Sequence, residues 1–159
     1  MSELNRWVDA ISQWYEERKH DQVEKLEPLI LTPPDSIWGP TITDTQSKAI
    51  ACWLDGCLRL YKANQFCAQQ KAFQFLQLAQ ARLQSVVSDP MSELDLKDWC
   101  MKRLQHLTVL SLEFCNQQDG KQWQSESNQL IEAHVHFMES HQWNENKWNE
   151  EKPHSRVMH

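Results

Sequence analysis

Asp55 and Arg59 are the charged pair best placed to act together, because they lie four positions apart in an otherwise apolar segment. On an α-helix this spacing brings two side chains to the same face. Two interpretations follow. The pair belongs to a polar pocket or partner contact beside Gly56, or it is an ion pair on the one wet strip of its helix and contributes a few tenths of a kcal/mol.

The histidines do not form a metal-ligand pattern. Glu132 and His136 are four apart and can share a helix face, whereas His134 and His136 point in different directions. Zinc needs three or four convergent ligands, and Cys115 and His141 could join this pair only through the tertiary fold. With three glycines in the chain, a phosphate-binding loop is disfavoured, and no nucleophile motif is present. We therefore expect no catalytic, cofactor or metal site.

The cysteines are expected to be buried apolar residues in a reducing compartment rather than disulfide or redox partners. They form an odd-numbered set without CxxC spacing, and all fall in segments predicted to be helical: Cys52, Cys57, Cys67, Cys100 and Cys115.

The charge balance disfavours nucleic acid as a partner. The formal net charge of −6 repels phosphate backbones, and the densest basic cluster, Lys97, Lys102 and Arg103, is small. Apolar runs are too short to span a membrane, and the N-terminal residues lack the apolar stretch of a signal peptide. We expect a cytoplasmic protein without a membrane contact.

The elements that position these residues are helices. Apolar residues recur at helical spacing almost throughout, which predicts an all-α fold: a bundle or short array of about three antiparallel helical hairpins, with five to six helices. The hairpins cover residues 4–27, 45–87 and 92–140. We expect residues 1–140 to form a single helical domain with an internal Pro-rich loop at 29–44, and residues 141–159 to form a polar tail.

Local signals set the expected helix ends. The first helix is expected to reach about Lys19, and a second, beginning at Asp21, should stop near Glu27 because Pro28 disfavours helix in the residue before it. Thr43 and Gln46 match a capping box. The expected ends of the later helices are Lys62, Val87, Phe114 and about Ser140. The fourth should begin at Phe66 and the fifth at Asp89-Pro90 or after Ser92.

Gly56 lies inside the predicted central helix, where it costs roughly 1 kcal/mol relative to alanine. Either another helix approaches closely there or the glycine is simply tolerated.

The middle hairpin resembles a tetratricopeptide repeat in Trp53, in the break before Phe66, and in Ala72, Phe73 and Ala79. It departs from that repeat at Asn64 and Gln69, no proline closes the unit, and the hairpins keep no fixed period. The resemblance therefore implies hairpin geometry and carries no binding residues.

The 29–44 loop is the candidate interaction surface. Ile37 and Trp38 lie at its middle and look exposed, and long loops inside compact domains are often functional. The alternative is that both side chains pin the loop to the helical core like a lid. Tryptophans on the apolar stripes, at 7, 14, 53, 99 and 123, are expected in the core, whereas Trp38, Trp143 and Trp148 fall in segments predicted to be irregular.

These patterns favour a non-enzymatic interaction protein, such as an adaptor, chaperone or regulator, that binds another protein through a groove between hairpins. The candidate partner-binding residues are Ile37, Trp38, Asp55 and Arg59. One alternative is a small-ligand-binding or enzymatic helical bundle whose polar groups converge only in three dimensions. A second is a nucleic-acid-associated accessory factor.

Overall fold

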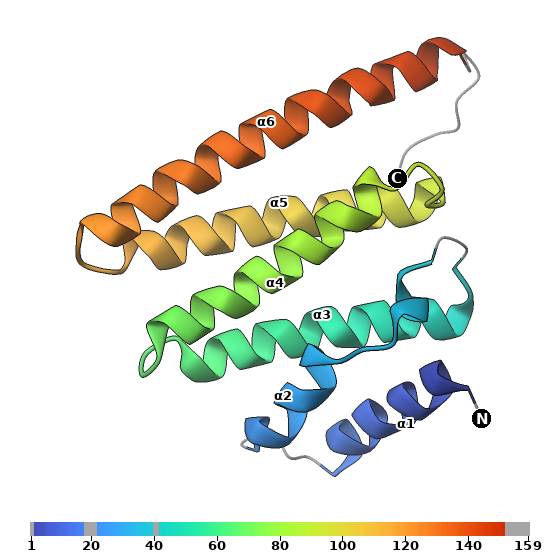
Figure 1. Cartoon of the computed structure of the whole chain (residues 1–159), viewed down its shortest axis with the longest axis vertical. Helices are drawn as coiled ribbons and strands as arrows, with labels where there is room; N and C mark the ends of the chain where they lie inside the picture. The colour runs from blue at the N-terminus through green and yellow to red at the C-terminus, as the bar shows by residue number, and fades with distance from the viewer. Residues whose placement is uncertain (1, 18–21, 40–41, 152–159) are drawn as a thin grey trace. The chain divides into compact units, whose positions relative to one another are not determined.

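The computed structural model describes residues 2–17, 22–39 and 42–151 (Figure 1). Within these ranges the chain forms helices and no strand, which confirms the all-α prediction. The elements in order are α1 (Glu3–Glu16), α2 (Val23–Leu31), a 3-10 turn η1 (Asp35–Trp38), α3 (Asp44–Asn64), α4 (Gln69–Ser88), α5 (Leu94–Asn116) and α6 (Lys121–Glu151). None of these helices is long and apolar enough to cross a membrane.

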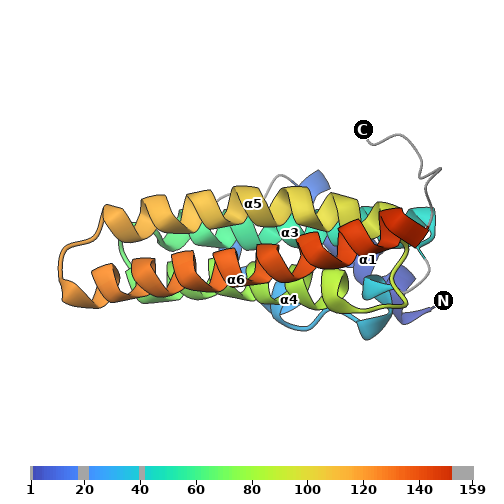
Figure 2. The same cartoon turned by 90° about the horizontal axis from the view of Figure 1, so that it is seen from above.

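The chain divides into two compact units, residues 1–109 and 110–159. In the first unit α3 is central: it pairs with α4 as an antiparallel hairpin and also contacts α1, α2 and η1 (Figures 1 and 2). Its capping box forms as predicted, because the Thr43 side chain accepts from the Gln46 amide and the Gln46 side chain accepts from the Thr43 amide. The largest side chains with almost no exposed surface in this unit include Trp53, Leu60, Leu76, Leu83 and Leu104.

Gly56 marks a close approach between α2 and α3. A Cβ built on Gly56 would overlap the Cδ1 atom of Ile30 and lie 2.8 Å from its Cγ1 atom. Alanine at this position would therefore collide with α2. Close approach, rather than simple tolerance, is the reason for a glycine inside α3.

Indole groups complete the C-terminus of α2. The last carbonyls of a helix lack partners within the helix. Here Trp7 Nε1 donates to the carbonyl of Leu29 at 2.9 Å, and Trp53 Nε1 donates to the carbonyl of Ile30, also at 2.9 Å. The Thr32 hydroxyl donates to the Pro28 carbonyl at 2.7 Å. Tryptophans from α1 and α3 thus bind the C-terminal end of α2 through two adjacent carbonyls.

The expected stop before Pro28 is wrong, because α2 continues through this proline to Leu31. Proline removes one backbone donor and crowds the preceding turn. Burial of Leu26 and Ile30, together with the indole hydrogen bonds at the end of α2, compensates for that cost. The loop is correspondingly shorter than predicted and begins at Thr32. The predicted helix ends at Lys19 and Asp21 lie outside the described residues.

Two other helix boundaries differ from the prediction, and a third decides between two predicted alternatives. Helix α4 begins at Gln69, so Phe66 lies in the preceding turn and is 83% exposed. Helix α5 begins at Leu94, which agrees with the predicted start after Ser92. The alternative start at Asp89-Pro90 is wrong, because the Asp89 side chain accepts from the Met91 amide at 2.9 Å and forms a turn instead of a cap. Helix α6 does not stop near Ser140 but reaches Glu151, since no proline or glycine interrupts it.

A buried polar pair joins α4 to α5 within the first unit. Gln80 Nε2 donates to the Thr108 hydroxyl at 3.1 Å, and that hydroxyl donates to the Leu104 carbonyl at 2.9 Å. The Oε1 atom of Gln80 is buried without a hydrogen-bond partner. Because both side chains are buried, this hydrogen bond favours one alignment of α4 against this part of α5.

The second unit contains the end of α5 and helix α6. Gly120 adopts a φ of 114° in the turn between them, a backbone conformation that favours glycine. On either side of this turn, Phe114 of α5 and Trp123 of α6 pack edge to face with ring centroids 5.4 Å apart. An aromatic pair therefore closes the end of this hairpin.

Replacing Gly56 with alanine should destabilise the protein by about 1–2 kcal/mol, because overpacking outweighs the gain in helix propensity. Chemical denaturation of Gly56→Ala would measure this loss. In an Ile30→Val background, which removes Cδ1, the same substitution should cost less. An increase in stability on Gly56→Ala alone would contradict the close approach.

Candidate functional site

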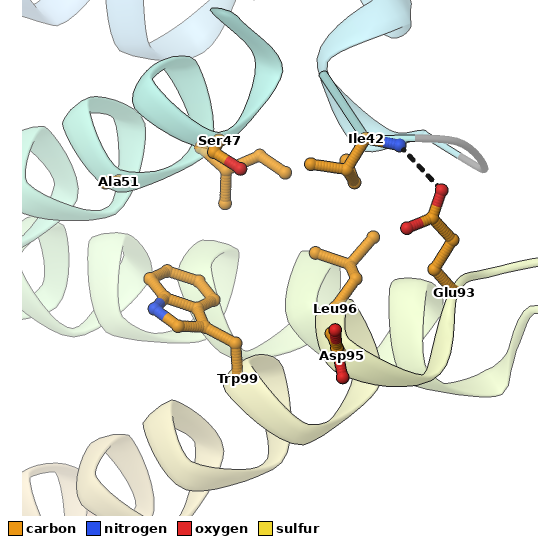
Figure 3. A pocket seen from close by; sticks show the side chains of 8 residues that line it. Ile42, Ser47, Ala51, Glu93, Asp95, Leu96 and Trp99 are labelled. Carbon is orange, nitrogen blue, oxygen red and sulfur yellow. Dashed lines mark hydrogen bonds between the residues drawn. The ribbon is translucent and has the colours of Figure 1, made fainter. Parts of the chain in front are cut away.

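A pocket of about 320 Å³ opens between the end of the loop, the first turns of α3 and the beginning of α5 (Figure 3). All of its residues belong to the first unit. It is lined by Ile42, Ser47, Ile50, Ala51, Glu93, Asp95, Leu96 and Trp99.

Backbone hydrogen bonds hold the loop side of the pocket. The Ile42 amide donates to Glu93 Oε1 at 3.2 Å, which ties the loop to the start of α5. On the other side, Gln46 Nε2 donates to the Ser36 carbonyl at 2.6 Å and so joins η1 to the first turn of α3. The first bond sets where the Ile42 backbone stands against α5, and the second sets where η1 stands against α3.

The lining combines apolar side chains with two carboxylates. Leu96 and Ile50 are buried, while the Trp99 ring is half-buried and faces the space between α5 and α3 (Figure 3). The guanidinium of Arg103 lies 4.8 Å from the centroid of the Trp99 ring, within the range of a cation–π contact. Glu93 and Asp95 are exposed. The pocket can therefore receive an apolar group and present negative charge to whatever flanks it.

Asp55 and Arg59 form the predicted ion pair, with Arg59 Nε 2.7 Å from Asp55 Oδ2. The Tyr15 hydroxyl donates to the same carboxylate oxygen, and the Arg59 guanidinium lies 5.1 Å from the Tyr15 ring centroid. Burial raises the pKa of Tyr15 well above its usual value, and the hydrogen bond to Asp55 raises it further. The hydrogen bond to Asp55 also raises the pKa of Arg59. These residues join α1 to α3, and they do not line the pocket.

Ile37 and Trp38 pack inward, so their exposed appearance in the sequence is misleading. Ile37 has no exposed surface, and Trp38 is half-buried. The Trp38 ring meets that of Trp53 edge to face at 4.8 Å, and the Arg82 guanidinium lies 4.9 Å from the Trp38 ring centroid. The two side chains hold the loop to α3 and α4 in the manner of a lid. Whether Trp38 also contacts a partner stays a prediction.

The cysteines and histidines are dispersed. Cys57, Cys100 and Cys115 are buried as predicted, and burial raises the pKa of Cys100 to about 12. The prediction is wrong for Cys67, which is exposed in the turn before α4. Burial lowers the pKa of His134. Among the described residues, no three histidine, cysteine or acidic side chains lie close enough together to hold a metal ion.

Comparisons of the chain with protein-family models, with curated proteins and with solved structures found no match. The functional argument therefore depends on the pocket itself.

The sequence indicated part of this site and missed the rest. Ile42 lies in the loop predicted to border a binding groove, but Trp99 was assigned to the core and Glu93 and Asp95 were not singled out. Asp95 and Trp99 are four residues apart at the start of α5, and this spacing could have indicated that an acidic and an aromatic side chain share one helix face. Their meeting with α3 depends on tertiary packing.

Trp38→Ala should lower the free energy of unfolding by about 2 kcal/mol, because the contacts with Trp53 and Arg82 are lost. Thermal and urea unfolding would measure this change, with the helical circular dichroism signal retained. An unchanged stability would contradict the lid role and favour the partner-anchor role.

Tyr15→Phe should reduce the loss of stability at alkaline pH. The pKa of Tyr15 is higher in the folded chain than its unfolded value of about 10, so its stabilising contribution is present below about pH 10 and is lost as the pH rises further. Urea unfolding at pH 8 and pH 11 should show a smaller decline for the variant. A difference of one bound proton between the folded and unfolded chains changes stability by ~1.4 kcal/mol per pH unit. Because Tyr15 is only half-buried, the two declines should differ by less than this value. Equal declines would contradict the assignment.

Proposed function

We propose that this chain is a non-enzymatic interaction module that binds another protein through the pocket between the loop, α3 and α5. The observation that carries the proposal is an apolar pocket with Trp99 half-buried in its wall and Ile42 of the loop at its edge. Partly exposed tryptophans in such pockets are frequent anchors of protein interfaces.

The dimensions of the pocket support a side chain as the occupant. Its volume of about 320 Å³ lies at the lower end of the roughly 300–1,000 Å³ typical of small-molecule sites. One large apolar side chain from a partner suits this space. The alternative of a small-ligand or enzymatic site would need further convergent polar groups, and the Asp55 and Arg59 pair is already engaged with Tyr15.

The other predicted contact residues do not line the pocket, and in this proposal they stabilise the helices and the loop around it. Ile37 holds the loop from inside the core, while Trp38, Asp55 and Arg59 are half-exposed. Adaptor, chaperone and regulator are versions of the same proposal that differ in the partner. A cytoplasmic location is part of it, since five free cysteines suit a reducing compartment.

Ala51→Phe provides a direct test, because Ala51 is an exposed residue of the pocket lining and a phenyl group there would occupy the space. Proteins enriched by the wild-type chain from its native cells should be captured at least about 10-fold less by the variant. Quantitative mass spectrometry of the captured proteins would measure this ratio.

Ala81→Phe is the matched control, since Ala81 is exposed on α4 and does not line the pocket. It should capture the same proteins as the wild-type chain, and both variants should retain the wild-type circular dichroism spectrum. Equal capture by Ala51→Phe and Ala81→Phe would show that the pocket is not the binding surface.

A further inference from the structure

We propose that Arg103 binds a carboxylate side chain of the partner protein, an aspartate or glutamate that lies within four residues of the apolar side chain in the pocket. This inference rests on the proposed function and adds the chemistry of the partner. Its basis is the Arg103 guanidinium, which stands beside the pocket wall without an acceptor among the described residues.

Arg103 lies one helical turn after Trp99, on the same face of α5. Its guanidinium carbon is 4.8 Å from the centroid of the Trp99 ring, and Trp99 lines the pocket (Figure 3). The N–H groups of a guanidinium lie in its plane, so a guanidinium placed over an indole ring still presents donors at its edges. Since Arg103 is exposed, an acceptor from a partner can reach these donors.

The helix around Arg103 offers no carboxylate to its side chain. None of the residues three or four positions away, which share its helix face, is acidic: Trp99, Cys100, His106 and Leu107. Asp98 is five positions away and lies about 140° around the helix axis. Arg59 shows the contrast, because Asp55 stands four positions before it and binds its guanidinium. Among the described residues, no hydrogen bond or ion pair engages the Arg103 guanidinium.

The two carboxylates of the pocket lining stand at the other end of the site. Asp95 and Glu93 precede Arg103 by eight and ten residues, which correspond to about 12 Å and 15 Å along the helix axis. Glu93 accepts from the Ile42 amide, and Asp95 has an interaction of its own. The site is therefore polar in one direction, and a carboxylate of the partner belongs at the Arg103 end.

The position of Arg103 limits the spacing in the partner segment. A carboxylate bound to its guanidinium through N–H···O bonds of about 2.7–2.9 Å lies within roughly 9 Å of the Trp99 ring centroid. Side chains two residues apart in an extended segment, or three to four apart on a helix, span such a distance. The acidic residue and the apolar residue therefore belong to one short segment.

The contact acts through geometry at short range. The chain carries a formal net charge of −6, so its overall field does not attract an acidic partner. A planar guanidinium can instead bind both oxygens of one carboxylate. Arg103 thus distinguishes among apolar segments that would otherwise fit the pocket equally well.

The test uses a display library of nine-residue peptides with leucine, phenylalanine or tryptophan at the centre, randomised flanks and no free C-terminus, selected on the full chain. Enriched peptides should carry aspartate or glutamate within four positions of the centre. Synthesised with amidated C-termini, they should bind Ala51→Phe at least about 10-fold more weakly than the wild-type chain, measured by fluorescence anisotropy.

The role of Arg103 is isolated by combining Arg103→Gln with peptides in which the selected aspartate or glutamate becomes asparagine or glutamine. On the wild-type chain the amide peptide should bind about 3- to 10-fold more weakly than the acidic peptide. On Arg103→Gln the two peptides should bind within about 2-fold of each other. If Arg103 only holds the Trp99 ring in place, Arg103→Gln weakens both peptides by the same factor, and that result would overturn the inference.

Arg6→Gln is the matched control, because it removes the same charged group from an exposed position of α1. It should prefer the acidic peptide as strongly as the wild-type chain does. Both arginine variants should retain the wild-type circular dichroism spectrum.

The outcomes separate the two proposals. Peptides that depend on Ala51 but have neutral or basic flanks would overturn the inference about Arg103 and leave the pocket assignment in place. Failure to enrich any peptide that distinguishes the wild-type chain from Ala51→Phe would overturn both. A wild-type dimer in sedimentation analysis that Ala51→Phe abolishes would make a second copy the occupant and would also overturn the inference.

Discussion

The contact between α2 and α3 at Gly56 is the constraint on which the first unit depends. Because Gly56 has no Cβ, Ile30 can lie directly against the backbone of α3. The same approach brings the end of α2 within reach of the Trp7 and Trp53 indoles, which donate to its terminal carbonyls. Apolar burial and backbone hydrogen bonding are thus satisfied by a single arrangement, which explains why a short helix with an internal proline is retained.

This contact also determines the path of the loop. Once α2 ends at Leu31, the chain turns into η1 and places Ile37 in the core and Trp38 against Trp53. Trp53 therefore takes part in two contacts, since its nitrogen completes α2 and its ring supports η1. Beside the pocket, Gln46 holds the Ser36 carbonyl of η1 and Glu93 holds the Ile42 amide. The pocket is a consequence of how the loop is fastened.

Local sequence patterns predicted the helices well where their signals were self-contained. The Thr43 and Gln46 capping box formed, and the apolar spacing around Trp53 predicted a buried face. The prediction failed where distant residues supply the missing interaction. Pro28 is a helix breaker by itself, and its helix is stabilised by burial of Leu26 and Ile30 and by indoles that come from α1 and α3. The pocket was only partly predictable for the same reason, because Ile42 and Trp99 are far apart in sequence and meet through packing.

The buried bond between Gln80 and Thr108 has a consequence for recognition. Apolar helix faces tolerate sliding, whereas an amide that must find one hydroxyl permits one register of α4 against this part of α5. A slip of one helical turn would displace α5 by about 5.4 Å along its axis, more than the reach of a hydrogen bond. Glu93 would then lose the Ile42 amide, and Leu96 and Trp99 of α5 would shift relative to the pocket residues of α3. The buried Gln80–Thr108 hydrogen bond therefore helps to align the pocket, although neither residue lines it.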